Sequence, residues 1–60
     1  MILDLPATAK ESLREMHDLL VQRGQEYDRN GHSFGYWAIH ARYEYVKAHY
    51  YELRNQERNG

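Results

Sequence analysis

Histidine and carboxylate side chains have the most obvious chemistry in this chain. There are four histidines among 60 residues. His40 with Glu44, and His49 with Glu52, are three or four residues apart, so each pair would share one face of a helix. Each pair could supply two ligands to a zinc ion, but a zinc site needs three or four converging ligands. The Glu-x-x-His pattern of di-iron bundles is absent. We therefore expect no metal and no other cofactor.

The remaining reactive residue types indicate a protein that is not an enzyme. Cysteine is absent, and the only serines are Ser12 and Ser33. Ser33 is expected to cap a helix, and the glycines around it lack the spacing of a phosphate-binding loop. A histidine near an interface could still titrate near neutral pH. Two helices form little of the concave surface on which an active site is built, so we predict no catalytic residues.

Length and composition limit the classes of protein that remain. A chain of 60 residues buries only about 60% of its unfolded surface. Without cysteine it cannot gain stability from disulfides, so oligomerisation or very good helix packing is expected. The formal net charge of −1 argues against nucleic-acid binding, because such proteins carry a basic surface. Residues 1–6 are too short for a signal peptide and no apolar run is long enough to span a membrane. We predict a cytoplasmic protein that does not contact a membrane.

Capping signals predict where two helices begin and end. The segment from Thr8 to Glu11 has the pattern of a capping box. Gly31 can adopt the positive φ that closes a helix, and Ser33 can cap the next one. We predict an all-α fold of one domain, an antiparallel two-helix hairpin. The first helix spans about residues 6–29, the turn 30–33 and the second helix about 34–56, followed by a frayed tail over 57–60.

Apolar residues at helical spacing predict the core between the two helices. If the turn lies at residues 30–33, residues whose numbers add to about 63 face each other, as Met16 and Val46 would. Gly24 costs about 1 kcal/mol relative to alanine in a helix, and we interpret it as allowing close helix approach. The predicted intra-hairpin core consists of Leu13, Met16, Leu20, Tyr27, Tyr36, Ile39, Tyr43, Val46, Tyr50 and Leu53.

The second helix has a further apolar stripe that the first helix cannot cover. It consists of Phe34, Trp37, Ala38, Ala41, Tyr45, Ala48 and Tyr51. An exposed patch of this composition is typical of an interaction surface. The simplest partner is a second copy of the chain, which would form a four-helix bundle. The alternative is that the aromatic rings lie flat on the hairpin and the alanines reflect helix propensity.

Two other kinds of partner stay open at this point. The segment ARYEYVKAHYYELR (residues 41–54) interleaves tyrosine with arginine, a pattern that can stack on single-stranded nucleic acid. Glu44 and Glu52 interrupt its positive charge, which weakens binding to phosphates. The other possibility is a subunit that is bound to a different, unidentified protein.

The segment GYWAIHARYEYVKAHYYELR (residues 35–54), after a short amphipathic helix, also resembles part of a known group of proteins. It is similar to the small accessory proteins encoded in the early region of lambda-like temperate phages, between recombination and excision functions. The resemblance covers about a third of the chain. It implies a helical hairpin without catalytic residues that acts in an adaptor or regulatory role, through contacts with host or phage proteins.

Overall fold

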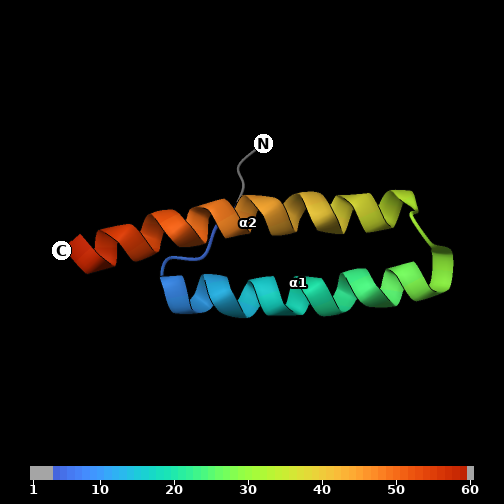
Figure 1. Cartoon of the computed structure of the whole chain (residues 1–60), viewed down its shortest axis with the longest axis horizontal. Helices are drawn as coiled ribbons and strands as arrows, with labels where there is room; N and C mark the ends of the chain where they lie inside the picture. The colour runs from blue at the N-terminus through green and yellow to red at the C-terminus, as the bar shows by residue number, and fades with distance from the viewer. Residues whose placement is uncertain (1–3, 60) are drawn as a thin grey trace.

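The chain forms two antiparallel helices joined by a short turn (Figure 1). The structure is a computed structural model and describes residues 4–59. Helix α1 spans Ala9–Asn30 and α2 spans Phe34–Asn59, and no strand occurs within 4–59. The principal extents of 43 × 24 × 12 Å describe a thin slab with two broad faces. The predicted all-α helical hairpin is therefore confirmed.

Helix α1 begins at Ala9, three residues later than predicted. Thr8 is extended, with φ −125° and ψ 158°, and its Oγ1 accepts a hydrogen bond from the backbone N–H of Glu11 at 3.2 Å. This bond satisfies one of the N–H groups that a helix start leaves unpaired. The predicted cap at Thr8 is therefore confirmed, and residues 4–7 form an arm instead of a helical turn.

The turn is stabilised by the Glu26 carboxylate as well as by Gly31 and Ser33, the two turn residues that the sequence predicts. Gly31 has φ 65°, and its N–H donates to Tyr27 O at 2.8 Å. Ser33 Oγ accepts from the backbone N–H of Tyr36 at 3.1 Å and donates to Glu26 Oε2 at 2.7 Å. Asn30 Nδ2 donates to the same oxygen at 2.8 Å. Glu26 therefore joins the end of α1 to the start of α2.

Helix α2 continues past the predicted end at residue 56. Residues 57–59, which we expected to fray, are helical, and residue 60 lies outside the described residues. Figure 1 shows these last turns extending beyond the start of α1. Glu57 Oε2 accepts a hydrogen bond from the backbone N–H of Ala9 at 3.1 Å. A carboxylate is favoured there because the first turn of a helix carries partial positive charge.

A small cluster of side chains fills the space between the helices. Val46 is fully buried, and Met16 and Leu19 contact it from α1. The partly buried residues packed against this cluster are Leu5, Ile39, Tyr43 and Tyr50. The predicted core residues Met16, Val46, Ile39, Tyr43 and Tyr50 are therefore placed as expected. Tyr36 and Leu53 are half-buried.

Three predicted core residues of α1 lie outside the core. Leu13 is 51% exposed, Leu20 is 39% exposed and Tyr27 is half exposed. Tyr27 still contacts Tyr36, with ring centroids 6.0 Å apart. The buried residues of α1 are Ala9, Ser12, Met16 and Leu19. Placing Leu13 and Leu20 in the core was wrong, because the buried stripe of α1 is rotated by about 50° from the predicted one.

Polar contacts near the turn account for this rotation. Arg23 Nη1 donates to His40 Nδ1 at 2.8 Å, and Glu26 bonds to Ser33. Both side chains must face α2 to make these bonds, which moves Leu20 and Tyr27 to one side. A two-helix hairpin buries a narrow stripe on each helix, so α1 cannot bury all of its apolar residues.

Gly24 does not serve the close approach that we expected. A Cβ atom added at this position would meet nothing within 4 Å, and Gly24 is exposed. Among residues 4–59, neither helix is long and apolar enough to cross a membrane.

Candidate interaction surface

All seven residues of the predicted interface stripe lie on an exposed surface of α2, which we call the outer face. Phe34 is 91% exposed and Trp37 is 52% exposed. The other members are also exposed: Ala38, Ala41, Tyr45, Ala48 and Tyr51. None of these side chains carries a charge, and the seven span most of the length of α2.

The N-terminal arm lies beside the outer face. A depression of about 270 Å³ is lined by residues from both segments, namely Leu5, Tyr45, Ala48, His49 and Glu52. Figure 1 shows the arm crossing from the start of α1 to α2. Leu5 therefore adds apolar surface next to the middle of the outer face. The small side chain of Ala48 leaves room there for an incoming residue.

An ion pair between Arg42 and Glu15 and two hydrogen bonds to carbonyl groups of the arm hold the arm and one flank of the hairpin together. Arg42 Nε donates to Glu15 Oε2 at 2.6 Å, and Arg42 Nη2 donates to Asp4 O at 2.7 Å. The bond to Glu15 raises the pKa of Arg42 above its usual range. His49 Nε2 donates to Pro6 O at 2.7 Å. We call this side, covered by the arm, the arm face.

Sequence reasoning missed the contribution of Arg42 and Glu15. The available signal was their position at the edge of each apolar stripe. Glu15 directly precedes the core residue Met16, and Arg42 lies four residues before the core residue Val46. An acidic residue at one edge and a basic residue at the facing edge form ion pairs in antiparallel hairpins. The arm could not have been placed in this way, because its bonds use backbone carbonyl groups.

An aromatic cluster occupies the turn end of the molecule. The His32 ring stacks on Trp37 with centroids 5.6 Å apart and an interplanar angle of 23°. It also contacts Tyr27 at 5.0 Å and Tyr36 at 4.9 Å, both edge to face. His32 therefore links rings from α1 and α2. Trp37, the aromatic anchor of the outer face, is thus held in place on one side.

Arg23 extends this cluster toward the middle of the hairpin. Its guanidinium lies 5.8 Å from the Tyr36 centroid and 5.6 Å from the Tyr43 centroid, within cation–π distance. His40 accepts the bond from Arg23 through Nδ1, and its Nε2 is 3.8 Å from Glu44 Oε1. The expected placement of His40 and Glu44 on one helix face is therefore confirmed.

The other side chains that could take part in catalysis or metal binding are not brought together. Ser33 is used as a cap, and His49 bonds to Pro6 instead of pairing with Glu52. His17 lies 4.0 Å from Asp18, and both side chains are exposed. No group of three or more histidine, aspartate or glutamate residues within 4–59 could hold a metal ion.

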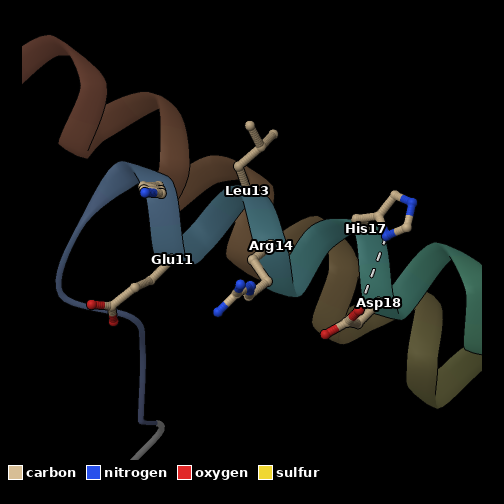
Figure 2. Close-up of a pocket in the computed structure, with 6 residues that line it drawn as sticks. Glu11, Leu13, Arg14, His17 and Asp18 are labelled. Atoms are coloured by element: carbon tan, nitrogen blue, oxygen red, sulfur yellow. Dashed lines mark ion pairs between the residues drawn. The ribbon is translucent and has the colours of Figure 1, made fainter.

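A surface depression on the outside of α1 has no contribution from α2. It has a volume of about 570 Å³ and is lined by Lys10, Glu11, Leu13, Arg14, His17 and Asp18. Figure 2 shows Leu13 and His17 projecting to one side of α1, whereas Arg14 and Asp18 project to another. These side chains diverge, so they do not converge on a small molecule as those of an active site do.

Comparison of the chain with protein-family models, with curated proteins and with solved structures finds no match in any of the three.

Proposed function

We propose that this protein is a non-enzymatic interaction module that forms a homodimer through the outer face of α2. The observation that carries the proposal is the exposure of seven uncharged residues, including Trp37 and Phe34, along one face. Tryptophan and tyrosine are enriched at protein interfaces because they bury a large area while keeping a polar group. Two copies related by a two-fold axis would form a four-helix bundle.

The surface area of the hairpin supports this proposal. Its accessible surface is 4756 Å², whereas a globular monomer of this mass is expected to expose about 4,100 Å². The excess of roughly 600 Å² is close to the roughly 800 Å² that each partner buries in a stable complex. A dimer would therefore bring the buried fraction of the chain to that of an ordinary small domain.

The contact between two outer faces has a sequence-level rationale. Ala41 and Ala48 are seven residues apart, so they lie on the same side of α2. Their small side chains let a second helix approach closely, and Trp37, Tyr45 and Tyr51 flank the approach. Phe34 lies at the end of α2 next to the turn and would pack against the end of the partner helix.

The biological role that we propose is that of an adaptor or regulator. It rests on the resemblance of residues 35–54 to small accessory proteins of lambda-like phages, and it fits the absence within 4–59 of a group of histidine, aspartate or glutamate residues that could hold a metal ion. A cytoplasmic setting fits a chain without cysteine.

The proposal is tested by measuring the mass in solution over a dilution series for the parent protein and for Ala48→Glu. The parent should be a dimer that dissociates on dilution. Ala48→Glu places a charge at the proposed contact, and it should give a monomer with at least tenfold weaker association. Trp37→Ala should weaken association by about 2–4 kcal/mol.

A matched control is Val21→Glu, which adds the same charge to an exposed position of α1 away from the outer face. This variant should keep the mass of the parent. If the parent is monomeric at all concentrations, or if Ala48→Glu keeps its mass, the outer face is not the dimer contact and the proposal is wrong.

A further inference from the structure

The broad face opposite the arm has a row of apolar side chains that the proposed dimer does not use. Leu13, Leu20 and Tyr27 are spaced seven residues apart and are 51%, 39% and 50% exposed. Leu13 and Glu15 lie about 160° apart around α1, and Glu15 bonds to Arg42 on the arm face. The row therefore lies on the other side of the hairpin, which we call the open face.

The flank of α2 on the open face is basic. Arg42 and His49, seven residues apart, mark the arm face through their bonds to Glu15 and Pro6. His40, Lys47 and Arg54, also seven residues apart, mark the opposite flank. Lys47 is 3.4 Å from Glu44, an exposed pair that is weak enough for Lys47 to exchange partners.

The acidic side chains near the core stripe of α1 lie on the other flank. Glu15 faces Arg42 there, and Glu26 bonds to Ser33 and Asn30. The hairpin is therefore polarised across its thickness even though its net charge is only −1. The open face combines an apolar row with the positive charges of Lys47 and Arg54 beside it. Two carboxylates, Glu44 and Asp28, also lie on this side.

Gly24 leaves a hollow in the open face. The hollow has a volume of about 390 Å³ and is lined by Arg23, Gly24, Tyr27, Asp28 and Tyr36. A Cβ atom at Gly24 would meet nothing within 4 Å, so the helix backbone is accessible at this point. The hollow can receive a large apolar side chain that packs against the Tyr27 and Tyr36 rings, which contact each other with centroids 6.0 Å apart.

We propose that the open face binds an acidic amphipathic helix of another protein. Its apolar stripe packs along Leu13, Leu20 and Tyr27 at matching seven-residue spacing, with one side chain in the Gly24 hollow. Its carboxylates lie beside Lys47 and Arg54, where opposite charge speeds association and selects the partner. This site does not depend on dimerisation through the outer face.

Other occupants fit the open face less well. A second copy on the open face offers no acidic flank to Lys47 and Arg54. A two-fold axis perpendicular to the helices would bring the two basic flanks together, and an axis parallel to the helices would set each basic flank against the partner's apolar row. Single-stranded nucleic acid needs exposed ring faces for stacking. Tyr43 and Tyr50 instead pack against the core, and Arg23 already lies over Tyr36.

The experiment uses two labelled synthetic helices of about three heptads that share leucine at the a and d positions. All charged positions are glutamate in one helix and lysine in the other. Fluorescence anisotropy with the full chain should show the glutamate helix binding at least about tenfold tighter than the lysine helix. A labelled single-stranded oligonucleotide should not bind. The proposal is overturned if the two helices bind equally, if the lysine helix binds more tightly, or if neither helix binds. It is also overturned if the oligonucleotide binds.

Variants locate the site. Leu20→Gln and Gly24→Gln should each weaken binding of the glutamate helix about tenfold, with helicity by circular dichroism unchanged. Val21→Gln is the matched control, because Val21 is 47% exposed and lies about 100° around α1 from Leu20. This variant should bind like the parent. Equal losses in Val21→Gln and Leu20→Gln would rule the open face out.

Charge reversal tests the basic flank. Lys47→Glu combined with Arg54→Glu should reverse the preference toward the lysine helix, and an unchanged preference would contradict the role of these residues.

The Ala48→Glu variant separates helix binding from dimerisation. It should keep the tighter binding of the glutamate helix even as a monomer. If Ala48→Glu stays dimeric and still binds that helix, the proposed function fails while the open-face site stands.

Discussion

Ser12 is the one buried side chain whose polar atom has no partner in the described part of the chain. It is fully buried in α1 opposite α2, and its Oγ makes no hydrogen bond there. A buried hydroxyl without a hydrogen bond keeps its desolvation cost, about 1–3 kcal/mol. A small residue is needed at this position because the helices are close, and serine fits by size more than by polarity.

Replacing Ser12 should therefore stabilise the protein. Ser12→Ala should raise the free energy of unfolding by about 1 kcal/mol, measured by urea denaturation followed by circular dichroism. Thr8→Ala is the control, because the Thr8 hydroxyl accepts a bond from Glu11; its loss should cost about 1 kcal/mol. A large loss of stability in Ser12→Ala would show that the hydroxyl has a partner.

The Glu26 carboxylate gives the turn a pH dependence. Hydrogen bonds from Ser33 and then Asn30 lower the pKa of Glu26 below its ordinary value of 4.5. The ionised form is thus favoured in the folded state. Its stabilising contribution is present above the unfolded pKa and is lost as the pH falls through the lowered folded pKa.

We expect the melting temperature of the parent to exceed that of Glu26→Gln near pH 6, and the two to converge as the pH falls below 4.5 and through the lowered pKa of Glu26. Comparing the variants at each pH cancels the titration of the other carboxylates. A difference that stays constant over this range would mean that the charge of Glu26 does not stabilise the turn.

At the scale of the helix, two adjacent leucines of α1 have opposite surroundings. Leu19 is 8% exposed and packs against Val46, whereas Leu20 is 39% exposed on the open face. The two residues have the same side chain and the same helix propensity, so only their position around α1 differs. They therefore report the rotation of α1 directly.

Leu19→Ala should lower the free energy of unfolding by about 2–3 kcal/mol, since it leaves a cavity in the core. Leu20→Ala should cost under about 1 kcal/mol. Both values come from denaturation at a fixed protein concentration. The reverse order would restore the originally predicted core, with Leu20 facing α2.

The whole molecule is too thin to bury a large core alone. Few side chains are buried between the two helices, and large apolar residues remain exposed on both the outer face and the open face. A single hairpin of this size is expected to be marginally stable. Association with a second copy would add the missing buried area.

If folding and dimerisation are linked, the melting temperature should rise with protein concentration, because mass action favours the associated folded state. Circular dichroism melts over a hundredfold range of concentration would show this. A melting temperature independent of concentration would indicate that the hairpin folds as a monomer. Addition of a chelator should leave the melts unchanged.

The sequence by itself determined the features that depend on neighbouring residues in the chain. Thr8, Gly31 and Ser33 set the start of α1 and the two ends of the turn, because capping and positive φ are local properties. The spacing of Ile39, Tyr43, Val46 and Tyr50 determined the buried stripe of α2. All four side chains of this stripe are large, whereas the outer face includes three alanines.

Only the tertiary structure decided how α1 is turned about its own axis. Leucine and methionine are spread over a wide arc of α1, so hydrophobic periodicity alone allowed both Leu19 and Leu20 to face α2. Bonds between residues far apart in the chain selected one of the two: Arg23 to His40, Glu15 to Arg42 and Glu26 to Ser33. The same rotation placed Leu13, Leu20 and Tyr27 on the open face, because residues that leave the narrow contact between two helices have no other element to cover them.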